Sequence, residues 1–178
     1  MSNWKPVSTL VFLFLCLGTA VVAGLQVFSE QHWVPLLDSA NLALHEAGHP
    51  IVGLVSSRLC VYGGTMFQLI FPLLVAREFR RQGHTAGLAL ALIWLGENLM
   101  NIGRYMADAR AQVLPLVGGG EHDWTEIFSR WGVLPLDTRI GGFTRFLGLV
   151  LMAYALIWLW RRIGSRDSQE MEDWENRQ

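Results

Sequence analysis

Residues 7–27 of this 178-residue chain read VSTLVFLFLCLGTAVVAGLQV, a run without a single charged residue. A helix needs about 20 consecutive apolar residues to cross the hydrocarbon core of a bilayer, so this run predicts a membrane-spanning helix. Lys5 before it and Glu30 after it favour an amino terminus on the inner side. The small residues at 20–24 would also suit a cleaved signal peptide, but the length of the run favours a retained helix.

The composition agrees with a membrane protein. Hydrophobic residues make up 52% of the chain, charged residues 16%, and the mean hydropathy is +0.31, whereas a soluble domain carries about 25% charged residues. A net charge of -1 gives no basic balance for binding nucleic acid. Cys16 and Cys60 do not form the CxxC pairs of a zinc ribbon. The length allows one domain.

Three further apolar segments predict helices at 41–57, 85–106 and 146–160. The sequence Tyr-Gly-Gly-Thr at 62–65 predicts a break in the backbone. The apolar stretch after it, 66–76, is only about a dozen residues long and contains Pro72, which favours a re-entrant segment over a full crossing.

We therefore expect an all-α polytopic membrane helix bundle with about four crossings plus a re-entrant segment. It would occupy residues 1–163 and leave a charged, disordered tail at 164–178. With four crossings, the basic clusters at 77–81 and 161–162 both fall on the cytoplasmic side with the two termini, as the positive-inside rule prefers. The start of the 41–57 helix and the polar connection 114–137 then share the outer side, which five crossings would prevent. A bacterial inner membrane is the expected location.

The segment 45–49 reads His-Glu-Ala-Gly-His, an HExxH motif within a predicted helix. Residues four apart share one helix face, so His45 and His49 can offer two imidazole nitrogens to one Zn²⁺ ion. Glu46 lies beside them and can act as the catalytic base that takes a proton from water. Ionisable groups at the centre of a membrane helix cost about 2.5–3.5 kcal/mol each. Metal binding would offset that cost.

A catalytic zinc site needs a third protein ligand and one open position. The candidates are Asp123 and His122, which follow the glycine run at 118–120, with Asp108 in reserve and Glu97 as a further acidic residue. One of the pair His122 and Asp123 could bind the metal while the other supports it. The residues alone leave the choice open.

A polar stripe marks the 85–106 helix and its end. Asn98, Asn101, Tyr105 and Asp108 are spaced three, four and three residues apart and so share one face. Polar stripes on membrane helices face the bundle interior or a wet cavity. We expect Asn98, Asn101 and Tyr105 to hold substrate or to orient the metal ligands, although hydrogen bonding between helices alone would also explain them.

The order of motifs resembles that of site-2-protease-like intramembrane metalloproteases and of small bacterial membrane proteins that carry HExxH. The shared features are the HExxH motif in a membrane helix, Gly63-Gly64 with a short apolar segment after it, and a later proline- and glycine-rich stretch that leads to Asp123. The resemblance covers about residues 41–137. It implies that Asp123 is the third ligand beside His45 and His49.

The chain departs from that family in three places. Trp124 follows Asp123 where the family has Leu-Asp-Gly, Pro50 follows the HExxH motif, and no added soluble domain is present in the sequence. The expected function is a membrane-embedded zinc metallopeptidase, acting on a membrane or membrane-adjacent protein or peptide unwound beside an exposed Gly63-Gly64 region. The alternative is a non-catalytic, zinc-stabilised membrane scaffold or inactive protease homologue.

Overall fold

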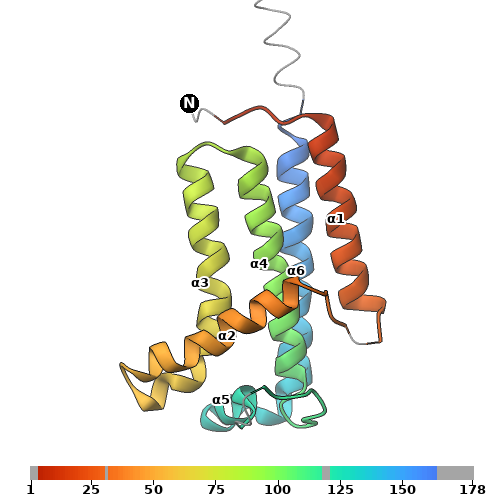
Figure 1. The fold of residues 1–178 in the computed structure, drawn as a ribbon. Helices are drawn as coiled ribbons and strands as arrows, with labels where there is room; N and C mark the ends of the chain where they lie inside the picture. Colours follow the sequence, from red (N-terminus) through yellow and green to blue (C-terminus); the bar gives the residue numbers. More distant parts are fainter. Residues whose placement is uncertain (1–3, 31, 118–120, 164–178) are drawn as a thin grey trace, which may run out of the picture.

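A computed structural model describes residues 4–30, 32–117 and 121–163 (Figure 1). Within these residues the regular structure is helical, and its longer elements are α1 (Thr9–Phe28), α2 (Leu37–Gly53), α3 (Cys60–Arg81), α4 (Thr85–Ala107), α5 (Asp123–Trp131) and α6 (Asp137–Trp160). Short 3₁₀ turns precede α3 and α6. The predicted all-α helix bundle is confirmed.

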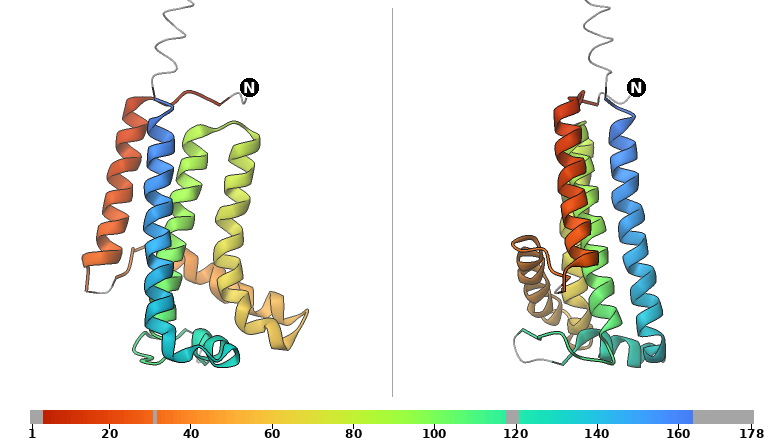
Figure 2. Two further views of the ribbon diagram at one scale, coloured as in Figure 1. Left: turned by 180° about the vertical axis from the view of Figure 1, so that it is seen from behind. Right: turned by 90° about the vertical axis from the view of Figure 1, so that its right-hand side faces the viewer.

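Four helices are long and apolar enough to cross a membrane: α1, α3 with the turn before it, α4, and α6 with the turn before it. They run roughly side by side, while α2 passes obliquely across one end of the bundle and α5 lies at that same end (Figures 1 and 2). The start of α1 and the end of α6 meet at the opposite end, where Val7 pairs with Ile163. Helices α2 and α5 thus lie at the same end of the bundle.

The prediction of a break at 62–65 and a re-entrant segment at 66–76 is wrong. Gly63, Gly64 and Pro72 all lie inside the continuous 22-residue helix α3. Membrane helices tolerate glycine and proline because neighbouring helices and side chains satisfy the freed backbone groups. The helix that falls short of a crossing is α2, which carries the HExxH motif.

Three boundaries also differ from the predicted ones. Helix α2 begins at Leu37 and ends at Gly53, and α6 begins at Asp137 rather than at residue 146. The polar connection 114–137 contains the nine-residue helix α5, which ends at Gly132 in the left-handed conformation that glycine favours. The predicted tail at 164–178 lies outside the described residues.

Glycines allow the helices to approach closely. Gly96 and Gly103 of α4 face Gly148 and Gly141 of α6, and a Cβ atom on either α6 glycine would clash with the carbonyl oxygen of its α4 partner. The same relation holds between Gly48 of α2 and Gly63 of α3. Small residues at such contacts allow extensive van der Waals packing where no hydrophobic driving force is available. The Gly48–Gly63 contact therefore fixes the HExxH helix against α3.

Replacing Gly48 with alanine should destabilise the protein, because the added methyl group would push α2 away from the Gly63 backbone. Overpacking of this kind typically costs about 1–3 kcal/mol. Thermal unfolding of the detergent-purified protein measures the effect. Gly24→Ala is the matched control, since Gly24 of α1 has open space around its Cβ position. Equal melting temperatures for Gly48→Ala and the wild type would contradict the contact.

Candidate metal centre

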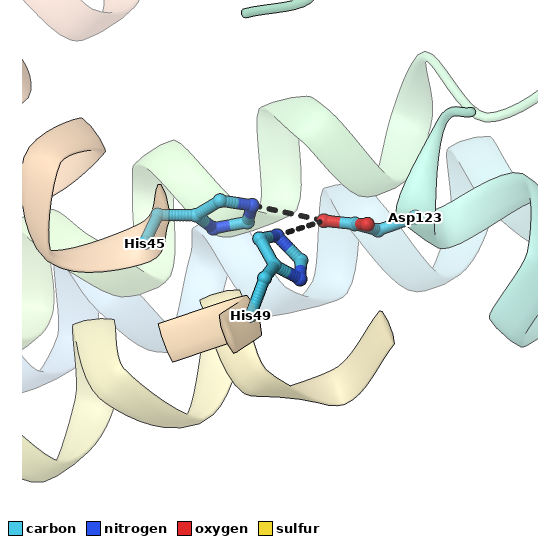
Figure 3. Close-up of side chains that lie close together, drawn as sticks. All are labelled: His45, His49 and Asp123. Carbon is cyan, nitrogen blue, oxygen red and sulfur yellow. Dashed lines mark hydrogen bonds and ion pairs between the residues drawn. The ribbon is translucent and has the colours of Figure 1, made fainter. Parts of the chain in front are cut away.

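Three side chains converge where α2 meets the start of α5 (Figure 3). His45 and His49 lie one turn apart on α2, and Nε2 of each points at the carboxylate of Asp123. Nε2 of His45 is 2.8 Å from Oδ2 of Asp123, and Nε2 of His49 is 3.3 Å from the same atom. One ligand atom from each residue falls within 4.8 Å of the others. This cluster could hold a metal ion.

Both histidines are oriented through their Nδ1 atoms. Nδ1 of His45 lies 2.9 Å from Oε1 of Gln68, and Nδ1 of His49 lies 2.9 Å from the backbone oxygen of Cys60. Both partners are oxygens that accept hydrogen bonds, so Nδ1 of each histidine carries a proton, and Nε2 of each can offer a lone pair to a metal once any proton on that atom has left. Metal-binding histidines are held in this way in known sites.

Gln68 and the carbonyl group of Cys60, which orient the two histidines, were not predicted from the sequence. Gln68 is 4% exposed, although it is a polar residue in the middle of the apolar stretch 66–76. A polar residue at this position indicates a hydrogen-bond partner on another helix, because a buried amide in a membrane helix needs one. The role of the Cys60 backbone carbonyl group as a hydrogen-bond acceptor cannot be predicted from a pattern of side chains.

A cavity of about 910 Å³ surrounds the cluster. The three metal-ligand candidates line it together with Glu46, which is half-buried, and with Leu114 and Pro115 from the connection before α5. The residue predicted as base and the predicted ligands thus share one cavity. The catalytic role of Glu46 stays a prediction.

Electrostatics couple the two histidines to Asp123. The hydrogen bond that His49 donates to the Asp123 carboxylate raises the pKa of His49 to about 9, although burial acts in the opposite direction. Burial also acts to raise the pKa of Asp123, but hydrogen bonds from His45 and His49 outweigh it and hold that pKa below its usual value. The carboxylate is therefore ionised at neutral pH, and a proton on His49 occupies the position that a metal would take.

The structure places His122 and Asp108 outside the cluster. His122 is the N-cap of α5, where Nδ1 accepts a hydrogen bond from the backbone of Thr125, and its Nε2 lies 3.5 Å from Oδ2 of Asp108. Asp108 accepts hydrogen bonds from the backbone nitrogens of Val113 and Leu114. The two residues hold the connection in place instead of facing His45. Glu97 likewise lies elsewhere and accepts from Gln26 and Asn41.

Part of the predicted polar stripe reaches the centre. The phenol oxygen of Tyr105 accepts a 3.2 Å hydrogen bond from the backbone nitrogen of Asp123, and its ring lies against His45. Asn101 accepts a hydrogen bond from Gln68. Asn98 is more remote and donates to Asn41 and to the Trp94 carbonyl group.

Gly63 and Gly64 have a different role from the predicted one. Both are buried in α3, Gly63 against Gly48 and Gly64 against the imidazole ring of His45. They offer no exposed backbone on which a substrate strand could pair, so that expectation is wrong. A side chain at residue 64 would instead overlap the His45 ring.

No family model, curated protein or solved structure matches this chain.

Removal of any one of the three cluster residues should abolish metal binding. We expect about one divalent metal per chain in the wild type, and a loss of it in His45→Ala, His49→Ala and Asp123→Ala, because each variant leaves only two protein ligands. Metal content by mass spectrometry on detergent-purified protein measures this. His122→Ala and Asp108→Ala are the controls and should keep the metal. A wild type that folds but takes up no added metal would contradict the assignment.

Metal affinity should fall as the pH is lowered from 8 to 6. His49 has a pKa of about 9 in the metal-free protein, so a proton must leave Nε2 before that atom can bind a metal. Metal binding that displaces one proton weakens about tenfold for each pH unit below the pKa. Competition with a chromophoric chelator at several pH values measures the slope. A flat profile would show that His49 does not bind the ion.

Proposed function

We propose that this protein is a membrane-embedded zinc metallopeptidase, similar in mechanism to the site-2-protease-like enzymes that its motifs resemble. One observation supports the proposal above all. His45, His49 and Asp123 lie close together in one cavity, and Glu46 of the HExxH motif lines the same cavity. Two elements that are far apart in the sequence build this arrangement at one end of a bundle of apolar helices.

The donor set suits zinc. Catalytic zinc is held by histidine nitrogens and carboxylate oxygens at about 2.0–2.2 Å, with three protein ligands and one open position. Tetrahedral ligands at that distance lie about 3.3 Å apart, close to the 2.8 and 3.3 Å that separate the two histidine nitrogens from Asp123. Two histidines and one carboxylate also serve iron(II), but the glutamate inside HExxH favours hydrolytic zinc chemistry.

A zinc ion held here would polarise a substrate carbonyl group and acidify the attacking water. The carboxylate of Glu46 would accept the proton from that water and return it to the nitrogen of the leaving amine. Asp123 would be kept in place by the hydroxyl group of Tyr105 through its backbone nitrogen. The cavity of about 910 Å³ leaves room for an extended peptide segment.

The position of the cavity favours a substrate chain in or beside the membrane. The basic residues at 77–81 and 161–162 lie with the start of α1 at the end of the bundle opposite α2 and α5. If that end is cytoplasmic, as the positive-inside rule prefers, the centre opens toward the outer face of a bacterial inner membrane. Both termini would then be cytoplasmic.

The rival proposal is a zinc-stabilised scaffold or inactive protease homologue. It would be favoured by a closed site with four protein ligands, in which His122 and Asp123 both bind the metal. His122 instead caps α5 and faces Asp108, which supports a site with an open position.

Glu46→Gln should abolish proteolysis and leave the metal in place, because the amide cannot accept the proton from water. Loss of a general base typically slows such reactions about 10²–10⁴-fold. Membranes that contain the wild type or Glu46→Gln can be compared by mass spectrometry of new protein termini. Glu78→Gln, at an exposed position on α3, is the matched control. A Glu46→Gln protein that cleaves at the normal rate would refute the proposal.

A further inference from the structure

A chain of hydrogen bonds connects His45 to a buried carboxylate on the first turn of α2. Nδ1 of His45 is 2.9 Å from Oε1 of Gln68 on α3, whose Nε2 donates to Oδ1 of Asn101 on α4 at 3.2 Å. Nδ2 of Asn101 donates in turn to Oδ1 of Asp38 at 2.9 Å. The chain passes through α3 and α4 before it returns to α2.

The carboxylate at the end of this chain is surrounded by donors. Besides Asn101, Asp38 accepts a 2.6 Å hydrogen bond from the backbone nitrogen of Val34, and Nε2 of Gln26 lies 3.5 Å from each of its oxygens. Asp38 is 1% exposed, so water cannot replace these partners. A carboxylate can only accept hydrogen bonds, and the three groups that face Asp38 in these contacts are all donors.

Because the Asp38 carboxylate can only accept, it fixes which atom donates in each of the hydrogen bonds that lead from Asp38 to His45. Asn101 has to turn its NH₂ group toward Asp38, which leaves its oxygen for Gln68. Gln68 then has to turn its NH₂ group toward Asn101, which leaves its own oxygen for His45. An oxygen at that place requires the proton of His45 to sit on Nδ1, so Nε2 keeps the lone pair that a metal needs.

We propose that Asp38 is a positioning residue that sets the tautomer of the metal ligand His45 through Asn101 and Gln68. Asp38 does not touch the centre and acts only through the order of donors and acceptors along the chain. The inference rests on the proposed role of His45 as a zinc ligand.

Asp38→Asn tests the proposal because it replaces an accept-only group by one that can also donate. With NH₂ of residue 38 facing Asn101, both amides can turn over, and Gln68 then presents its NH₂ group to His45. The proton of His45 would move to Nε2 and oppose metal binding. We expect zinc to bind about 10–100-fold more weakly, the usual effect of losing an outer partner of a metal ligand.

Asp38→Asn combined with Gln68→Glu should restore the affinity. The new carboxylate at residue 68 accepts from His45 Nδ1 directly, and Asn101 can satisfy it by turning its NH₂ group toward residue 68 and its oxygen toward residue 38. The double variant keeps the charge of the wild type and moves it along the chain. Because a local packing role of Asp38 would not be repaired by a change on α3, this rescue separates the proposal from a structural effect.

Asp137→Asn is the matched control. Asp137 is another buried carboxylate, but it accepts its hydrogen bonds from Arg110 and Thr138 and stands outside the chain to His45. The same exchange of carboxylate for amide at this position should leave zinc affinity unchanged, because it alters no hydrogen bond of the chain.

Zinc affinity is measured by chelator competition for the wild type, Asp38→Asn, the double variant and Asp137→Asn, with thermal unfolding of each. The proposal expects a loss in Asp38→Asn alone and recovery in the double variant. Wild-type affinity in Asp38→Asn, or a folded double variant that binds no better than the single one, would overturn it.

A second measurement covers the case in which Asp38→Asn does not fold. In metal-free Asp123→Ala, which lacks the carboxylate that competes for the Nε2 proton, ¹⁵N spectra of the His45 ring should show the proton on Nδ1. A proton on Nε2 would overturn the proposal. Neither measurement uses peptide cleavage, so a protein without protease activity would leave this inference standing, and a failure here would leave the Glu46 chemistry untouched.

Discussion

Polar side chains buried in a bundle of apolar helices have to satisfy one another, because lipid offers them no hydrogen bonds. Helix α2 depends on this constraint. It is not among the four helices that are long and apolar enough to cross a membrane. Its buried residues Asp38, Asn41 and His45 find partners on α3, α4 and α5. The close Gly48–Gly63 contact brings the helix near enough to α3 for those hydrogen bonds to form. The candidate metal centre lies at one end of this chain of polar contacts.

Local chemistry explains what the sequence could predict. The spacing of His45 and His49 places both on one helix face in any helical context, and the apolar run at 7–27 is long enough to span a bilayer wherever it packs. The helix predicted at 85–106 agrees with α4 to within one residue. The residues alone offered both Asp123 and His122 as the third ligand, and the resemblance to a protease family favoured Asp123, which the structure brings beside both histidines.

Tertiary contacts explain what the sequence could not predict. Gly63, Gly64 and Pro72 are typical of a broken segment, yet α3 is continuous through all three. At 63 and 64, Gly48 and the His45 ring occupy the space that side chains would need. Helix α5 was not predicted within the polar connection, because its first turn is capped by the side chain of His122. The partners of the histidines, Gln68 and the carbonyl group of Cys60, become visible only when α3 is placed against α2.

We propose that His45, His49 and Asp123 bind a zinc ion with a fourth position open beside Glu46. Anomalous X-ray scattering at the zinc edge, from crystals of the protein purified with zinc, would locate the ion. We expect one strong peak between Nε2 of His45, Nε2 of His49 and the Asp123 carboxylate, with solvent as the fourth ligand. No peak at this place, or a fourth protein ligand that closes the site, would contradict it.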